Sequence, residues 1–202
     1  MKVVVLSSGG VDSSLTMMLL RKEKHDVFPC HVDYGHLAEE REWPACQAVC
    51  KYLGVNPPVR FRVGGTKAIP SGLVHPELDI EKQAFFPTRN LLFATLGAAY
   101  AHGISCHVIA LGIVANPIFP DQTEGFFQKA QECISSALGV ETTIMTPLIS
   151  LDKREVLKLA KARGLPFELT YYCHSGKAQP CGVCISCKER ITAEKMLLEG
   201  SS

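Results

Sequence analysis

The sequence has no long apolar run and no excess of charge of either sign. Its 202 residues carry 21 Lys and Arg against 20 Asp and Glu, which gives a formal net charge of +1. Proteins dedicated to duplex DNA normally show a basic excess, so this balance argues against a nucleic-acid partner. No stretch reaches the roughly 18 apolar residues that a membrane span needs, and we therefore expect no membrane partner either.

We also expect neither a secretory signal nor a disulfide framework. The apolar residues 3–6 behind Lys2 are too few for the core of a signal peptide, and polar residues follow directly. The nine cysteines are an odd number, and a chain of this length can bury a core without disulfides. We therefore expect a cytoplasmic protein in which some of the thiols bind a metal.

Two common phosphate-binding motifs do not occur, the Walker loop and the dinucleotide fingerprint G-x-G-x-x-G. Residues 6–14 instead read LSSGGVDSS, between a predicted strand and a predicted helix. The glycines allow several backbone N–H groups to face one anion, the serine hydroxyls add donors, and the helix adds its positive end. A carboxylate in such a loop suits a bridging Mg²⁺. The sequence therefore predicts a phosphate-binding loop of Ser7, Ser8, Gly9, Gly10, Val11, Asp12 and Ser13, with a turn that binds nothing as the alternative.

Strands and helices alternate along the chain. Short β-branched or apolar runs predict strands at residues 3–6, 27–33, 105–113 and 142–145, and helical periodicity predicts helices at 13–22, 39–53, 90–102, 123–138 and 152–163. Asp152 and Glu155 are spaced as a capping box at the start of the last of these helices. Residues 56–88 are rich in Gly and Pro and are expected to be irregular and functional. This order predicts an α/β fold with a doubly wound parallel sheet, as one domain at 1–165 and a separate tail at 166–202.

Four cysteines gather in the tail. Cys173, Cys181, Cys184 and Cys187 follow the spacing C-x7-C-x2-C-x2-C. Four thiolates form a closed structural Zn²⁺ site without an open position for a catalytic water. A pair of redox disulfides and an iron–sulfur cluster are the alternatives.

The other cysteines have an ordinary interpretation. A free cysteine is commonly a small buried hydrophobic residue, so we expect five of them in the core: Cys30, Cys46, Cys50, Cys106 and Cys133. His174, next to the first tail cysteine, is expected to face solvent rather than to replace a ligand.

The loop and the cysteine tail together resemble the 7-cyano-7-deazaguanine synthase family, within the superfamily of N-type ATP pyrophosphatases (PP-loop proteins). Residues 8–13 match the S-G-G-x-D-S motif of that family, and residues 181–190 match its C-G-x-C-x-x-C-x-x-R. The other matches, in chain order, are Asp33, Tyr34 and Gly35 for D-Y-G, Pro87, Arg89 and Asn90 for P-x-R-N, and Leu151, Lys153 and Glu155 for L-x-K-x-E. The resemblance covers nearly the whole chain and implies an adenine nucleotide alpha hydrolase-like core.

The resemblance implies an ATP-dependent C–N ligase of queuosine or archaeosine biosynthesis. Such an enzyme converts 7-carboxy-7-deazaguanine and ammonia, here taken as free ammonium, to 7-cyano-7-deazaguanine through adenylated intermediates. Mg²⁺ and Zn²⁺ are the implied cofactors, and a homodimer is the implied assembly. Arg89 and Lys153 are then the expected cations at the phosphates, and Asp12 and Asp121 the expected ligands of Mg²⁺ or substrate. Asp33 lies in the region expected to contact the adenine.

One stretch departs from the family pattern. Residues 119–126 read FPDQTEGF where family members usually have Y-P-D-C-R-P-E-F, so Gln122 and Thr123 replace a cysteine and an arginine. An arginine there would suit a contact with a carboxylate or a phosphate. One alternative is therefore a paralogue that adenylates the same acid and couples it to another amine, for example on a protein. Two others are a PP-loop tRNA thiolase, which the balanced charge does not favour, and a non-catalytic zinc-ribbon module, which leaves residues 8–13 unexplained.

Overall fold

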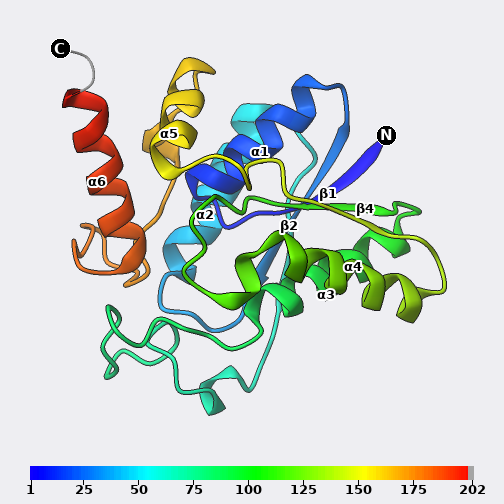
Figure 1. The fold of residues 1–202 in the computed structure, drawn as a ribbon, viewed down its shortest axis with the longest axis horizontal. Helices are drawn as coiled ribbons and strands as arrows, with labels where there is room; N and C mark the ends of the chain where they lie inside the picture. The colour runs from blue at the N-terminus through cyan, green and yellow to red at the C-terminus, as the bar shows by residue number, and fades with distance from the viewer. Residues whose placement is uncertain (200–202) are drawn as a thin grey trace.

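The computed structural model describes residues 1–199 and contains a sheet of five parallel strands (Figure 1). The strands are β1 (Lys2–Leu6), β2 (Asp26–Asp33), β3 (Val59–Arg62), β4 (Val108–Leu111) and β5 (Thr143–Met145), in the spatial order β3-β2-β1-β4-β5. Leu6 at the end of β1 pairs with Cys30 of β2 and with Leu111 of β4. The carboxyl ends of the three central strands therefore meet at one edge, where open α/β sheets bind their ligands.

Helices cover both faces of the sheet because successive side chains of a strand point to opposite faces. Val3 and Val5 pack with α1 (Val11–Lys22) and α2 (Glu39–Leu53). Val4 packs on the other face with α3 (Arg89–Gly103) and α4 (Glu124–Leu138). A helix beside α1, α5 (Lys153–Ala162), extends the first layer, and 3-10 turns lie at Thr66–Ala68, Pro120–Gln122 and Phe167–Leu169. The predicted doubly wound α/β core is confirmed.

Two elements lie where the sequence pattern predicted none. β3 falls inside the segment 56–88, and it is an edge strand of four residues without a fully buried side chain. A helix of the tail, α6 (Ile185–Glu199), begins directly after Cys184. Each lacks the clear apolar periodicity from which strands and helices are recognised.

The core prediction for the cysteines holds at four of the five positions. Cys30, Cys46, Cys50 and Cys106 are buried, whereas Cys133 is exposed, so the prediction for Cys133 is wrong. The apolar face of α4 is formed by its neighbours Ala130 and Ile134, and Cys133 lies outside that face.

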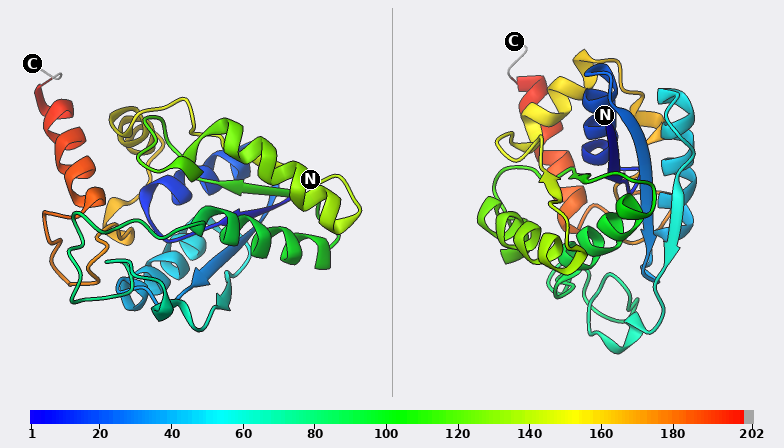
Figure 2. Two further views of the ribbon diagram at one scale, coloured as in Figure 1. Left: turned by 60° about the horizontal axis from the view of Figure 1, so that its bottom comes forward. Right: turned by 90° about the vertical axis from the view of Figure 1, so that its right-hand side faces the viewer.

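The tail lies against the core at the carboxyl edge of the sheet. α6 runs beside α5, and Ala193 is buried in the same apolar cluster as Leu15 of α1 and Leu157 of α5. Figure 2 shows α6 and the segment before it at the end of the molecule away from the N-terminus. Within the described residues, no helix is long and apolar enough to cross a membrane.

Candidate active site

The phosphate loop predicted at residues 7–13 connects β1 to α1 at the carboxyl edge of the sheet. Ser7 N donates to Cys30 O at 2.8 Å, which anchors the start of the loop on β2. α1 begins at Val11, two residues earlier than predicted, with Gly10 as its N-cap residue. The free amides and the positive dipole end of this first helical turn are the groups that attract an anion.

The two serine hydroxyls predicted to donate to phosphate are engaged inside the loop. Ser13 Oγ donates to Gly10 O at 3.2 Å and accepts from Ser8 N at 3.3 Å. Ser8 Oγ accepts from Gly10 N, also at 3.3 Å. These bonds hold the loop in one shape before a ligand arrives, which lowers the entropy lost on binding.

Gly9 allows the loop to pack directly on α2. Its φ of +77° lies in the left-handed region, and a Cβ atom would stand 2.5 Å from Cys46 N and 2.8 Å from Glu42 O. No side chain can be added at this position unless the backbone of the loop or of α2 moves. The first glycine of the motif is therefore required for the close packing of the loop on α2.

We expect the Gly9→Ala variant to lose stability and nucleotide binding together. The left-handed backbone alone costs about 1–3 kcal/mol for a residue with a Cβ, and the contact with α2 adds to that loss. Gly125→Ala is the matched control, because nothing lies within 4 Å of a Cβ there and alanine favours a helix. Urea unfolding and ATP titration measure both effects. A Gly9→Ala protein as stable as Gly125→Ala would contradict this account.

A cavity of about 260 Å³ opens on the phosphate loop. Its lining includes every residue of the loop except Gly9, together with Arg89 from α3 and Lys153 from α5. The tail supplies a further wall through Tyr171, His174 and Glu189. The structure therefore brings together most of the predicted site residues, and it joins the phosphate loop to the tail.

Lys153 and Asp12 form an ion pair between α5 and α1. Lys153 Nζ lies 2.6 Å and 2.8 Å from the two carboxylate oxygens of Asp12. Lys153 occupies the first position of α5, where the helix dipole disfavours a cation. It lies between the two members of the predicted capping box, Asp152 and Glu155, which the structure confirms. Burial raises the pKa of the nearby Glu189 carboxyl, which Lys153 opposes. The pair places a cation beside the loop at an electrostatic cost, which is typical of a ligand site.

Two predicted site residues, Asp33 and Asp121, do not belong to the cavity lining. Asp33 accepts hydrogen bonds from Arg60 at 2.9 Å and from Gly35 N at 3.0 Å. The Asp121 carboxylate accepts from Asn90 N at 3.1 Å, and Asp121 O accepts from Asn90 Nδ2 at 2.9 Å. These contacts hold the turn after β2 and the start of α3, and thereby position neighbouring cavity residues.

The stretch that departs from the family pattern makes its own local bonds. Gln122 Oε1 accepts from Ile118 N at 2.9 Å and from Phe119 N at 3.0 Å. Thr123 is the N-cap residue of α4, and its Oγ1 accepts from Phe126 N at 3.2 Å. Gln122 also belongs to the cavity lining. The replacement residues therefore stabilise the turn that carries them.

His31 connects the phosphate loop to a buried charge network that sequence reasoning missed. Its Nδ1 donates to Ser7 O, and its Nε2 lies against Glu39 Oε2, both at 2.8 Å. Burial lowers the pKa of His31, but hydrogen bonds with Cys46 and Glu39 outweigh burial and raise it to about 10. The charged imidazolium thus fixes the position of the loop at neutral pH. Arg60 lies 2.7 Å from the other oxygen of Glu39.

The tail contacts the loop directly. Tyr171 N donates a hydrogen bond to Gly9 O at 3.1 Å, and this bond joins the backbone of the tail to that of the phosphate loop. His174 belongs to the cavity lining, and its Nδ1 is buried without a hydrogen-bond partner. Burial and the nearby Arg89 lower the pKa of His174 to about 4. The expectation that His174 faces solvent is wrong, because the chain folds back over the site at this point.

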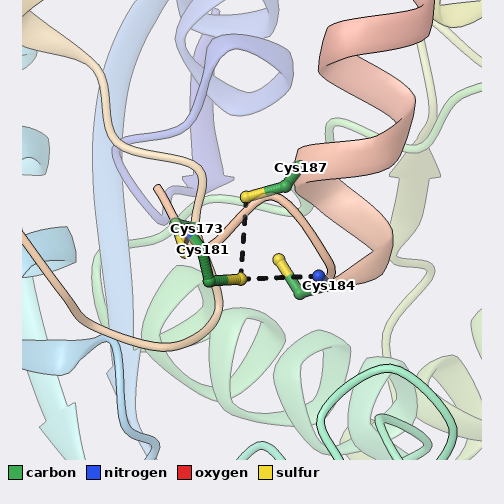
Figure 3. Close-up of side chains that lie close together, drawn as sticks. All are labelled: Cys173, Cys181, Cys184 and Cys187. Carbon is green, nitrogen blue, oxygen red and sulfur yellow. Dashed lines mark hydrogen bonds between the residues drawn. The ribbon is translucent and has the colours of Figure 1, made fainter. Parts of the chain in front are cut away.

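The four tail cysteines lie together at the start of α6 (Figure 3). Their sulfur atoms are all within 4.8 Å of one another, and the Cys181 and Cys187 sulfurs are 3.9 Å apart. Tetrahedral Zn–S bonds of about 2.3 Å place sulfurs about 3.8 Å apart, so the spacing fits Zn²⁺. Backbone N–H groups of Cys181 and Cys184 donate to Sγ of Cys173 and Cys181 respectively, as in metal-binding turns.

The ionisation of these thiols also fits a cation. Burial raises the pKa of Cys181, but N–H groups of Cys184 and Val183 outweigh burial and lower it to about 6. Burial raises the pKa of the Cys184 and Cys187 thiols. A bound cation would favour the thiolate forms of Cys184 and Cys187 against this effect of burial.

Comparison with known proteins gives a family match over almost the whole chain. The family described as "Queuosine biosynthesis protein QueC" matches residues 2–197. The curated 7-cyano-7-deazaguanine synthase of Nautilia profundicola is 32% identical over 203 residues, which cover 94% of this chain and 91% of that protein. The corresponding protein of Campylobacter jejuni is 31% identical over 94% of this chain and 92% of its own length.

Solved structures with a similar fold are more distant in sequence. A U34-tRNA thiolase from Methanococcus maripaludis, NcsA with its 4Fe-4S cluster, has a TM-score of 0.53 at 17% identity and matches 99% of this chain and 67% of its own. A 4-thiouridine synthetase in complex with RNA and ATP has a TM-score of 0.55 at 16% identity, over 98% of this chain and 50% of its own. These likenesses confirm the predicted α/β fold.

Proposed function

The chain belongs to the QueC family of queuosine biosynthesis proteins, and we propose that it is an ATP-dependent 7-cyano-7-deazaguanine synthase. The observation that carries this proposal is the cavity between the phosphate loop and the cysteine tail, whose walls come from both motifs. A phosphate loop alone would support any nucleotide enzyme. The tail closes the site with residues that a small polar substrate can contact.

The proposed reaction uses two molecules of ATP. A carboxylate oxygen of 7-carboxy-7-deazaguanine attacks the α phosphorus, pyrophosphate leaves, and ammonia then displaces AMP from the acyl adenylate to give an amide. A second ATP adenylates the amide oxygen, and loss of AMP and protons leaves the nitrile. In this proposal the loop amides and Lys153, which line the cavity, bind the departing pyrophosphate, and the chain contributes positioning and electrostatic stabilisation.

Two metal ions complete the proposal. Mg²⁺ would arrive with ATP and neutralise phosphate charge, and Asp12 is the loop carboxylate on the cavity wall that would hold it. Zn²⁺ would bind the cluster of Cys173, Cys181, Cys184 and Cys187 and supply structural cross-linking without chemistry of its own. An iron–sulfur cluster on the same thiolates is the alternative for that site.

The resemblance to the family also supports a homodimer in the cytoplasm, with free ammonium as nitrogen donor. We further propose that residues 166–202 are a tail stapled by metal onto the core 1–165. Its described part contacts the core through Ala193 and the phosphate loop through Tyr171. Light scattering on the purified protein tests the dimer.

A product assay tests the proposed function. We expect 7-carboxy-7-deazaguanine, ATP and ammonium to give 7-cyano-7-deazaguanine by mass spectrometry, with two AMP and two pyrophosphate released for each nitrile. ¹⁵N-ammonium should label the nitrile nitrogen. A reaction without ammonium is the negative control and should give no nitrile. A reaction with the Gly125→Ala protein is the positive control and should give the nitrile.

Each other outcome of this assay points to a different function. AMP release that stops at an amide, or a conjugate with an added amine or protein, would replace the synthase by the amine-coupling paralogue. Sulfur transfer to a tRNA would indicate a thiolase. Absence of pyrophosphate release with every deazapurine acid would overturn an enzymatic role.

A further inference from the structure

The cavity wall next to the tail contains a partly buried anion, Glu42 of α2. Its Oε2 accepts from His36 Nε2 at 3.0 Å, and its side chain is 15% exposed. Burial raises the pKa of Glu42, but His36 and His31 outweigh burial and hold it below its usual value. The carboxylate is therefore ionised at neutral pH, and it can accept further hydrogen bonds from a ligand because a carboxylate has about four acceptor sites.

A partly buried cation, Arg89, lies on the same wall. Within residues 1–199, the Arg89 guanidinium donates a long hydrogen bond of 3.4 Å to Tyr34 Oη. Its central carbon lies 6.0 Å from the centre of the Phe93 ring. A guanidinium has five N–H donors in a planar fork. Most of this donor capacity is left for a ligand, and a ligand that pairs with it avoids the cost of donors shielded from water without partners.

Glu42 and Arg89 thus offer an acceptor and a donor to one ligand, without forming an ion pair with each other among the described residues. His36 and Tyr34 stack at 4.3 Å on this wall and supply a rigid aromatic face. The Nδ1 atoms of His36 and His174 are buried there without partners. A planar ligand with one donor edge and one acceptor edge would complement Glu42 and Arg89 on this wall.

A 7-deazaguanine acid has these two edges. The ring N1–H and the 2-amino group are adjacent donors, whereas O6 and the carboxylate on C7 are adjacent acceptors. Two adjacent N–H donors match one carboxylate, and two adjacent oxygen acceptors match the fork of one guanidinium. The phosphate loop, with Lys153, remains free for ATP.

We propose that Glu42 binds the N1–H and 2-amino edge of the deazaguanine ring, and that Arg89 binds its O6 and C7-carboxylate edge. This inference rests on the proposed function for the identity of the ring. It assigns Arg89 to the acid rather than to the ATP phosphates. It also places the specificity for guanine-type rings on Glu42, a residue outside every motif that the chain shares with the family pattern.

Equilibrium binding tests the assignment without turnover. The full-length, metal-loaded protein is saturated with α,β-methylene ATP and titrated with three ligands: the deazaguanine acid, its analogue without the 2-amino group, and its analogue without the carboxylate. We expect the wild-type protein to bind the first ligand about 30- to 100-fold more tightly than either analogue, because each analogue leaves a charged group of the cavity wall without its partner.

Each variant should lose one preference and keep the other. Glu42→Gln should bind the acid and its 2-desamino analogue within about 5-fold of each other, and still discriminate against the analogue without the carboxylate. Arg89→Met should show the reverse pattern. Glu40→Gln, at an exposed position of the same helix, is the control and should keep both preferences. A protein that is merely misfolded would lose both preferences, so the pattern separates recognition from stability.

The outcomes are distinct for the assignment and for the function. If the Glu42→Gln protein keeps the wild-type preference for the 2-amino group, the assignment is overturned. It is also overturned if this protein instead has a lower affinity for α,β-methylene ATP. If the binding pattern appears but no nitrile forms from the natural reactants, the assignment stands and the synthase function fails. Equal binding of all three ligands by the wild-type protein refutes the assignment whatever the product assay gives.

Discussion

The Lys153→Met variant is expected to lose on the order of 10²- to 10³-fold in kcat/KM for pyrophosphate release. Lys153 Nζ lies within 2.8 Å of both Asp12 oxygens and belongs to the cavity wall beside the phosphate loop. When pyrophosphate departs, negative charge grows on its bridging oxygen, and a fixed cation stabilises that charge more than it stabilises bound ATP. The loss should therefore fall mainly on kcat.

The control for this variant is Lys158→Met, which removes an exposed lysine of the same helix. We expect its kcat and KM to stay within about 2-fold of the wild type, because exposed ion pairs contribute little. Lys153→Arg should recover part of the rate, since it keeps the charge with a different shape. Initial rates over a range of ATP concentrations separate kcat from KM. A Lys153→Met enzyme with more than a third of the wild-type rate would show that Lys153 only anchors α5 to α1.

The fold was predictable from the sequence wherever an element has a strong period or a strong stop. The run at residues 3–6, the glycine stops and the capping box of Asp152 and Glu155 all specify their elements locally. β3 was not predictable, because this edge strand, V-R-F-R, has three half-buried residues and one exposed residue, and it is stabilised by pairing with β2 rather than by its own pattern. α6 was missed because it has no clear apolar periodicity, and its first turn lies directly beside the cysteine cluster.

The site residues likewise fall into a group that the sequence predicts and a group that it does not. The phosphate loop and the metal cysteines are contiguous motifs, so their spacing alone predicts their chemistry. Asp33 and Asp121 also lie in motifs, yet their side chains point into hydrogen bonds with Arg60 and Asn90 rather than onto the cavity. Whether a motif carboxylate faces a ligand or a neighbouring backbone depends on tertiary packing that the sequence does not display.

Glu42 and His174 line the cavity although the sequence pattern does not mark them as site residues. Glu42 lies in a run of charged residues at the start of α2, which reads as a solvated helix face, and His174 reads as a neighbour of a metal ligand. Both reach the cavity because the tail folds back onto the loop, where Tyr171 N bonds Gly9 O. The signal that could have found Glu42 is its spacing of three residues from Glu39. This spacing places both carboxylates on one face of α2, and Glu39 is buried.

The Cys184→Ser variant is expected to lose its metal and to affect stability and activity together. Cys184 is fully buried within the cluster, and a structural Zn²⁺ contributes on the order of 10 kcal/mol to the folding of small zinc domains. A loss of even about 4 kcal/mol would lower the Tm by roughly 8–16 °C for a chain of this size. Because Tyr171, His174 and Glu189 of the tail line the cavity, we expect kcat/KM to fall at least about 100-fold.

Cys133→Ser is the matched control, since Cys133 is an exposed cysteine on α4, away from the cluster. Elemental analysis should give one zinc per chain for the wild type and for Cys133→Ser, and less than about 0.1 for Cys184→Ser. Differential scanning fluorimetry gives the Tm, and pyrophosphate release gives the rate. Iron with inorganic sulfide in the wild-type protein would replace zinc by a cluster on the same thiolates. A Cys184→Ser protein with full zinc and an unchanged Tm would refute the stapling role, because a tetrahedral thiolate site cannot keep its affinity after losing one of four ligands.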